Sequence, residues 1–180
     1  MTQKHFVQAG TFHITTTTAS REPWCNLPGV PQMIIDNLCM SRNVHGVKLH
    51  AFCILPDHIH LILSCNEKGF SSFMHSFKKT TSRDVSRFLG GSDFRIAAAE
   101  VKGSRSGGSK TAASPVLPLR VKWQKGYHDE LIRTSVQRST ALAYVQGNAM
   151  KHELVHDILD WPWTSLHFEH LSDPLEVWLD

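Results

Sequence analysis

Residues 55–63 read Leu55-Pro56-Asp57-His58-Ile59-His60-Leu61-Ile62-Leu63, and the stretch 44–55 that leads into them reads as a strand. Pro56-Asp57 predicts a turn, so 44–55 and 58–65 are expected to pair back on each other as two strands. Residues i and i+2 of a strand point to the same face, so His58 and His60 project together and Ile59 projects the other way. We assign Leu61 and Leu63 to the histidine side and Ile62 to the side of Ile59.

The remaining elements are expected on either side of this hairpin. β-branched residues over 11–18 predict a strand, and apolar spacing predicts a helix over about 30–43. Ser71 can cap a helix that reaches about Leu89, with Phe88 on its buried side, before Gly90-Gly91 ends it. A fourth strand over 119–123 and a helix over about 135–150 complete the pattern. The fold class is therefore α+β, a ferredoxin-like antiparallel sheet (βαββαβ) with one additional helix.

Length and composition are those of one domain spanning 1–180. The chain has 180 residues, of which 41% are hydrophobic and 19% charged. It contains no run of 18 apolar residues and no apolar leader at its start, so we expect no membrane partner and a cytoplasmic, nucleoid-associated location. A net charge of +3 permits a nucleic-acid partner without requiring one.

Two further features of composition restrict the organisation. The four cysteines contain no Cys-x-x-Cys pair, which disfavours a zinc ribbon and favours buried free thiols. From Gly90 to Leu119 the chain is rich in Gly, Ser, Lys and Arg and poor in apolar residues. Such a segment is uncommon inside a compact domain, so we interpret about 90–119 as a flexible basic insertion.

Four polar side chains are candidates for chemistry. Two imidazoles side by side can bind one divalent cation, although with 12 histidines in the chain, His58 and His60 could equally be strand residues that bind nothing. Tyr144 and Asn148 share a face of the predicted helix because they are four residues apart. A phenol beside a carboxamide oxygen suits a nucleophile next to a third ligand, whereas a helical tyrosine is more often a packing residue.

The ordered set of motifs resembles the REP-associated tyrosine transposases, single-tyrosine members of the HUH endonuclease superfamily. The resemblance rests on Leu-Pro-Asp-His-Ile-His-Leu, on the segment 123–133, on Tyr144 with Asn148, and on Trp161-Pro162-Trp163. Two departures are an Ala149 where the family often has Pro, and the long segment over 90–119.

The resemblance implies a metal-dependent single-strand DNA endonuclease and strand transferase acting on hairpin-forming repeats, the REP palindromes. His58, His60 and Asn148 would hold Mg²⁺ or Mn²⁺, and Tyr144 would form a 5′-phosphotyrosine. Single-stranded or hairpin DNA would be the partner, with monomer and homodimer both open. An inactive DNA-binding regulator and a metal-dependent hydrolase using Asp57 and water remain as alternatives.

DNA binding also needs cations and stacking surfaces. The candidate cations are Lys78, Lys79, Arg83, Arg87, Lys102, Arg105, Lys110, Arg120, Lys122 and Lys125, any of which could instead simply be solvated. Trp161 and Trp163 could stack on bases or close the core. Tyr127, the other tyrosine, is expected to lie near the site without attacking phosphorus.

Overall fold

The computed structural model describes residues 9–66, 70–90 and 121–174. Its principal elements are β1 (Gly10–Thr17), α1 (Val30–His45), β2 (Lys48–Ile54), β3 (His58–Cys65), α2 (Ser71–Gly90), β4 (His128–Ile132), α4 (Ser135–Gln146) and α5 (Asn148–Lys151). Short 3₁₀ turns lie at Ala19–Arg21, Trp24–Asn26, Ile158–Asp160, Ser165–His167 and Glu169–Leu171. The basic insertion expected over 90–119 lies almost wholly outside the described residues.

The four strands form one antiparallel sheet in the order β2-β3-β1-β4. The α+β class and the antiparallel sheet are thus confirmed, and β1 to β4 with α1 and α2 follow the βαββαβ order. The strand β3 is central, and its register places His60 opposite Thr15 of β1 and Cys53 of β2. The hairpin at 55–63 therefore holds the middle of the sheet.

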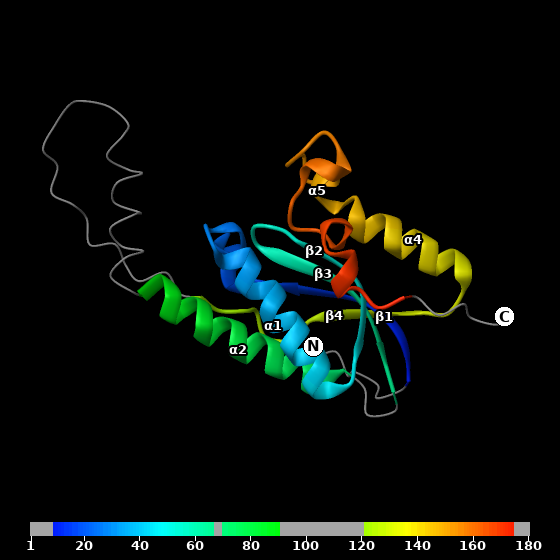
Figure 1. The fold of residues 1–180 in the computed structure, drawn as a ribbon, viewed down its shortest axis with the longest axis horizontal. Coiled ribbons are helices and arrows are strands. Elements are labelled where there is room, and N and C mark those ends of the chain that lie inside the picture. Colours follow the sequence, from blue (N-terminus) through cyan, green and yellow to red (C-terminus); the bar gives the residue numbers. More distant parts are fainter. Residues whose placement is uncertain (1–8, 67–69, 91–120, 175–180) are drawn as a thin grey trace, which may run out of the picture.

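The two faces of the sheet carry different side chains. The helices α1 and α2 cover one face, where Ile59, Leu61 and Leu63 join the large core cluster, and α4 lies on the opposite face (Figure 1). Ile62 packs on the α4 side in a smaller cluster that includes Val145. Placing Leu61 and Leu63 with the histidines was therefore wrong, because strand alternation puts even-numbered residues of β3 on the α4 face.

The fourth strand is displaced from its predicted position. It runs over His128–Ile132, whereas Trp123 makes only an isolated bridge to Thr18. The Trp123 ring is 8% exposed and its centroid lies 4.7 Å from that of Trp24. In the described part of 119–123, Val121 and Trp123 pack in the core instead of extending a strand, which is a common reason for strand propensity to mislead.

The C-terminal helix and the end of α2 differ from what the sequence predicts. The predicted helix over 135–150 stops at Gln146, and α5 begins after Gly147. Phe88, expected to be buried, is 42% exposed in the last turn of α2. Its ring closes over Gly29, which has a φ of 79°; a Cβ at Gly29 would approach the ring to 3.0 Å. Glycine suits this position on both counts.

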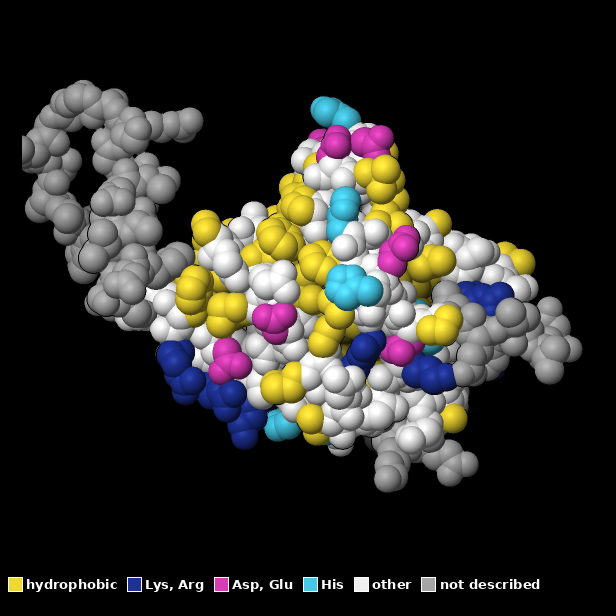
Figure 2. Space-filling view, viewed as in Figure 1, with side chains coloured by type: hydrophobic (Ala, Val, Ile, Leu, Met, Phe, Trp, Pro, Cys, Tyr) yellow, Lys and Arg dark blue, Asp and Glu magenta, His cyan; other side chains and the backbone are white. Residues whose placement is uncertain are grey.

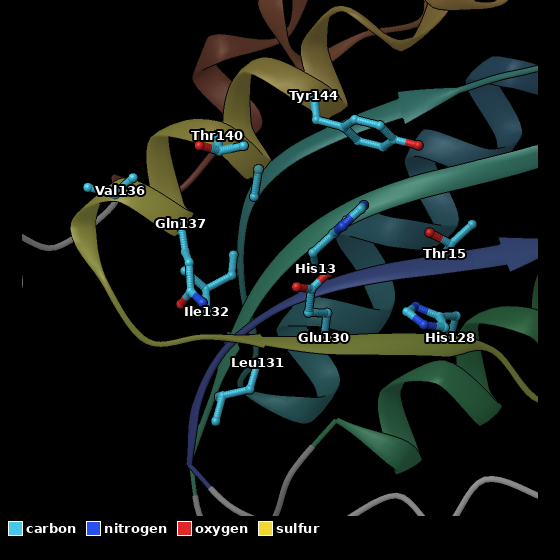
Figure 3. Close-up of a pocket in the computed structure, with 11 residues that line it drawn as sticks. His13, Thr15, His128, Glu130, Leu131, Ile132, Val136, Gln137, Thr140 and Tyr144 are labelled. Atoms are coloured by element: carbon cyan, nitrogen blue, oxygen red, sulfur yellow. The ribbon is translucent and has the colours of Figure 1, made fainter.

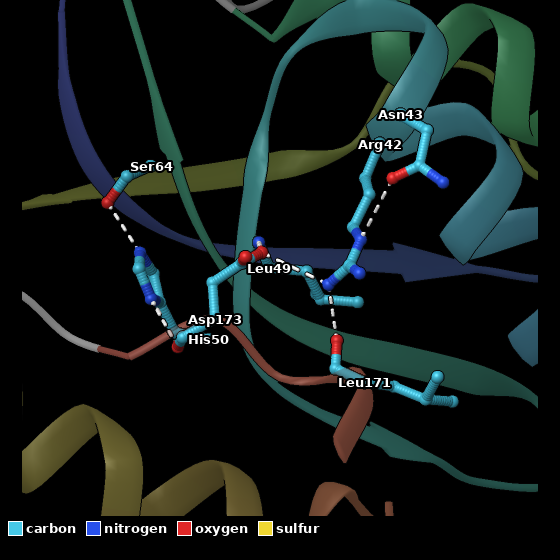
Figure 4. A network of polar contacts seen from close by, with 7 residues as sticks. All are labelled: Arg42, Asn43, Leu49, His50, Ser64, Leu171 and Asp173. Atoms are coloured by element: carbon cyan, nitrogen blue, oxygen red, sulfur yellow. Dashed lines mark hydrogen bonds and ion pairs between the residues drawn. The ribbon is translucent and has the colours of Figure 1, made fainter. Parts of the chain in front are cut away.

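A polar network ties the end of the described chain to the sheet (Figure 4). The Asp173 carboxylate accepts a hydrogen bond from the Leu49 amide at 2.8 Å and pairs with Arg42 at 3.1 Å. The His50 ring bridges the Asp173 carbonyl at 3.0 Å and the Ser64 hydroxyl at 2.7 Å. These bonds hold the C-terminal segment against β2. Among the described helices, none combines the length and apolar character that crossing a membrane requires.

Candidate functional site

His58 and His60 lie side by side on the α4 face of β3. Their side chains are almost completely buried, and their ring centroids are 5.0 Å apart at an interplanar angle of 83°. The strand alternation produces this pairing directly. The burial comes from α4 and α5, which cross above the strand.

Neighbouring groups fix the orientation of both rings through their Nδ1 atoms. His58 Nδ1 lies 2.6 Å from the Asp57 carboxylate. His60 Nδ1 lies 3.0 Å from the Thr15 hydroxyl and 3.1 Å from His13 Nε2. A proton on each Nδ1 satisfies these contacts and leaves the Nε2 lone pair for a ligand, as in metal-binding histidines oriented by outer groups.

The surroundings keep these imidazoles neutral. Burial, followed by the nearby His58, His13, His152 and Lys151, lowers the pKa of His60 to about 3. Burial also lowers the pKa of His58, although the adjacent Asp57 acts in the opposite direction. A metal ligand must be the neutral imidazole, so both rings are in the required state over the physiological range.

The segment from Tyr144 to His152 brings a second set of side chains over the histidine pair. The Tyr144 ring lies 5.3 Å from that of His60, and the His152 ring lies 5.0 Å from that of His58. Asn148 is one turn from each, so it lies between the two contacts. It is wholly buried, and its Oδ1 has no hydrogen-bond partner among the described residues.

Tyr144 has a cationic neighbour that sequence patterns did not reveal. Lys151 donates a hydrogen bond to the Tyr144 hydroxyl at 3.2 Å, and its Nζ lies 4.4 Å from the ring centroid. Partial burial raises the pKa of Tyr144, but Lys151 and the Asn148 side chain outweigh it, so the pKa falls below its ordinary value. The ammonium therefore favours the phenolate, which is the more nucleophilic form of the side chain.

The donor set at this point can be tested for its fit to a cation. Within the described ranges, no three His, Cys, Asp or Glu side chains converge in a metal-holding cluster. A third protein ligand would therefore come from another residue type. The unpartnered Asn148 Oδ1 is a buried polar oxygen on the segment between Tyr144 and His152, whose rings contact His60 and His58. Two imidazoles and one carboxamide oxygen fit a six-coordinate divalent ion that keeps bound water. The imidazoles favour Mn²⁺ over the harder Mg²⁺.

A cationic groove begins next to His58. Asp57, which orients His58, also pairs with Arg21 at 3.1 Å. Arg21 lines an open groove of about 650 Å³ together with Lys122, Trp123 and Lys125. Three exposed cations thus lie within one groove that adjoins the histidine pair.

Of the other candidate cations, four lie on α2 and four fall outside the described residues: Lys78, Lys79, Arg83 and Arg87 on α2, and Lys102, Arg105, Lys110 and Arg120 outside. Figure 2 shows Lys and Arg side chains gathered where α2 lies in Figure 1, on the side of the sheet away from α4. Lys78 of α2 donates to the carbonyls of Gln124 and Gly126, and burial lowers its pKa to about 8. Lys78 therefore anchors a loop, which removes it from the surface available to DNA.

Tyr127 and the two tryptophans are structural. Tyr127 packs against the core on the α1–α2 side, where its hydroxyl lies 3.2 Å from that of Ser71, so its expected place near the histidines was wrong. Trp161 donates to the Ile54 carbonyl at 2.9 Å, and the Trp163 carbonyl accepts from the Ile54 amide at the same distance. Both tryptophans close the core along β2.

Parts of this chain are similar in sequence to known transposases. Residues 6–90, which include β1, β2 and the His58–His60 pair, match the family model described as "Transposase IS200 like". Over this stretch the chain is similar to the IS200-like transposases. It is 27% identical over 119 residues to a putative REP-associated tyrosine transposase of Haemophilus influenzae (strain ATCC 51907 / DSM 11121 / KW20 / Rd). That match covers 65% of this chain but only 57% of the relative's length.

A solved structure extends the likeness of fold to the rest of the chain. The structure of a REP-associated tyrosine transposase bound to a REP hairpin superposes with a TM-score of 0.65 at 18% identity, covering 100% of this chain and 92% of that one. This match includes α4, which the IS200-like family model does not reach. The position of α4 over the sheet is thus shared with that solved structure.

Proposed function

We propose that the chain is a metal-dependent single-strand DNA endonuclease and strand transferase, built on a ferredoxin-like HUH domain. The observation that carries this proposal is the contact of Tyr144 with both His60 and Lys151. A phenol with a lowered pKa lies beside two neutral, oriented imidazoles and an orphaned carboxamide oxygen. This contact supports placing the proposed nucleophile beside the proposed cation-binding groups, as transesterification of a phosphodiester would require.

The residues divide the chemistry among themselves. Tyr144 Oη attacks phosphorus, the bond from phosphorus to the 3′-oxygen breaks, and the products are a 5′-phosphotyrosine and a 3′-hydroxyl. Lys151 stabilises the phenolate as the phenolic proton leaves. His58, His60 and Asn148 would hold Mg²⁺ or Mn²⁺, which when bound supplies positive charge to a non-bridging phosphate oxygen. Attack by a second 3′-hydroxyl reverses the step and joins strands.

Hairpin DNA is the proposed substrate. One solved relative is bound to a REP hairpin, and the groove with Arg21, Lys122 and Lys125 offers cations beside the cleavage point. Single-strand binding needs such a cationic track to follow the phosphates. Arg21 also reaches Asp57, so a phosphate bound there would lie close to His58.

Two other functions make different predictions. A DNA-binding regulator would bind hairpins without cutting them, and a hydrolase would use Asp57 with water. The Asp57 carboxylate is already engaged by His58 and Arg21, which disfavours the hydrolase. Incubation with labelled single-stranded hairpin DNA and Mn²⁺ separates the three, because only the proposed enzyme leaves protein attached to a 5′ end.

The groove makes a prediction about salt dependence. Replacing Lys122 and Lys125 by Ala should weaken single-stranded DNA binding and reduce the slope of log K against log salt by about 1.4, because each lost phosphate contact removes roughly 0.7. The matched control replaces Lys79 and Arg87 on the α2 side and should leave the slope unchanged. Fluorescence anisotropy across a salt series measures both. A reversed pattern would place the DNA on α2.

Lys151 makes a prediction about pH. Because Lys151 lowers the pKa of Tyr144, the Lys151→Ala variant should raise that pKa and shift the rising limb of the cleavage rate to higher pH. At neutral pH the variant holds less phenolate and should cleave several-fold more slowly, by roughly tenfold per pKa unit. Lys151→Arg, which keeps the charge, should retain most of the wild-type profile. Identical profiles for Lys151→Ala and wild type would remove Lys151 from the chemistry.

A further inference from the structure

A pocket of about 450 Å³ opens beside Tyr144, between α4 and the strands β1 and β4 (Figure 3). Its walls include His13, Glu130, Ile132, Gln137, Ala141 and Tyr144. This volume is in the usual range for sites that bind a small ligand or one unit of a polymer. The proposed cleavage chemistry uses Tyr144 and, through their contacts with His60, His13 and Thr15. The Glu130, Gln137 and apolar walls of the pocket have no assigned role.

The pocket presents one oriented donor and one strong acceptor. Gln137 Oε1 accepts hydrogen bonds from the amides of Arg133 at 2.8 Å and Thr134 at 3.2 Å in a capping box. These bonds fix the side-chain amide and leave its Nε2 hydrogens to the pocket. Glu130 extends from β4 toward His13 in Figure 3 and contributes a carboxylate, which only accepts when ionised.

Apolar side chains on two facing elements form the remaining walls of the pocket, and a flat ring could lie between them. Ile132, which is 7% exposed, and Ala141 lie on facing elements. A planar heterocycle could bury its faces against them while its polar edge meets Glu130 and Gln137. No cluster of three metal-type ligands occurs in the described part of the chain, so Glu130 with His13 and His128 does not form a cation site.

We propose that this pocket binds one unpaired guanine of the DNA strand, within a nucleotide or two of the phosphate that Tyr144 attacks. The Watson–Crick edge of guanine carries two adjacent donors, N1–H and N2–H, beside the O6 acceptor. A carboxylate can accept both donors in a bidentate, charge-assisted pair, while the Gln137 amide donates to O6. Adenine and cytosine would turn a ring-nitrogen lone pair toward Glu130, and thymine offers only one donor. This inference rests on the proposed function for the position of the strand.

The test uses short single strands, d(TGT), d(TIT) and d(TTT), titrated into the full chain and followed by amide NMR shifts. Inosine lacks only the N2 amino group of guanine, so it should bind roughly tenfold more weakly if a hydrogen bond to the carboxylate is lost. The shifts should centre on Glu130, Ile132 and Ala141. Equal affinity for d(TGT) and d(TIT), or shifts outside the pocket, would overturn the proposal.

A matched pair of variants assigns the discrimination to Glu130. Glu130→Gln should abolish the preference for d(TGT) over d(TIT), whereas Asp129→Asn should keep it. The control removes the same charge from the next residue of β4, which points to the other face. If Glu130 acted only by its electrostatic influence on His13, Glu130→Gln would leave the ratio of the two affinities unchanged, and the guanine site would be refuted.

A second arm separates this inference from the cleavage proposal. A pool of hairpins with randomised single-stranded flanks is incubated with the protein and Mn²⁺, and the DNA in covalent adducts is sequenced. Guanine should be enriched at one position near the junction with wild type and not with Glu130→Gln. Adducts without that enrichment would refute the pocket and support the enzyme. Absence of adducts with intact d(TGT) selectivity would refute the enzyme and leave guanine binding established.

Discussion

Tyr144→Phe should abolish the covalent adduct with single-stranded DNA while leaving DNA binding within about twofold of wild type. The substitution removes one oxygen from a side chain that is 38% exposed and keeps the ring that contacts His60 and His13. Loss of an attacking group typically costs at least about 10³ in rate, so the adduct should fall below detection. Denaturing gels of a labelled hairpin measure the adduct, and anisotropy measures binding.

Tyr127→Phe is the matched control, because the chain has only two tyrosines. Tyr127 packs with Phe70 and Ser71 on the opposite side of the sheet from the histidine pair. Its variant should give a wild-type adduct yield with at most a small loss of stability. An adduct mapped to Tyr127, or an undiminished yield from Tyr144→Phe, would contradict the proposed site.

Removal of the cation-binding groups should have an effect of similar size. His60→Asn is the sharper substitution, since an asparagine oxygen or nitrogen can replace Nδ1 in the contacts with Thr15 and His13 but offers nothing at the Nε2 position. Cleavage should be lost while the melting temperature stays close to wild type. Excess EDTA should likewise stop the wild-type enzyme, and added Mn²⁺ or Mg²⁺ should restore wild type but not His60→Asn.

Because His60 is buried, a loss of activity in the His60→Ala variant would not by itself identify a metal ligand. His60→Ala deletes a side chain that is only 4% exposed and leaves two polar partners without a hydrogen bond, which costs about 1–3 kcal/mol. A loss of activity in that variant would mix chemistry with stability. His75→Ala, on an exposed position of α2, controls for histidine removal as such. Cleavage at the wild-type rate by His60→Asn in EDTA would refute the metal proposal.

Local sequence determined much of the framework because its signals act over a few residues. The Pro56-Asp57 turn between two apolar runs predicts the β2–β3 hairpin, and β3 begins and ends at the expected residues, His58 and Cys65. Strand alternation alone brings His58 and His60 to one face, and helical spacing alone brings Tyr144 and Asn148 to one face. The resemblance to a transposase family rested on those same short motifs.

The position of β4 and the break in the last helix were outside the reach of local patterns. Trp123 is a residue type that favours strands, but its side chain packs in the core beside Trp24. The strand that pairs with β1 forms instead at His128–Ile132. Gly147 could be read as one weak helix position, yet it separates α4 from α5. In both cases tertiary packing outweighs a propensity difference of roughly 1 kcal/mol or less.

For the site, too, local sequence determined some features and only the tertiary structure determined the others. Sequence determined which groups could act together within one element: His58 with His60, and Tyr144 with Asn148. Only the tertiary structure decided that the two pairs meet, that Tyr127 lies across the sheet from them, and that His13, Asp57 and Lys151 complete the surroundings. Those contacts depend on the register of β1 against β3 and on the path of α5 over the sheet. Both are set by burial of apolar side chains far apart in the chain, which no local spacing records.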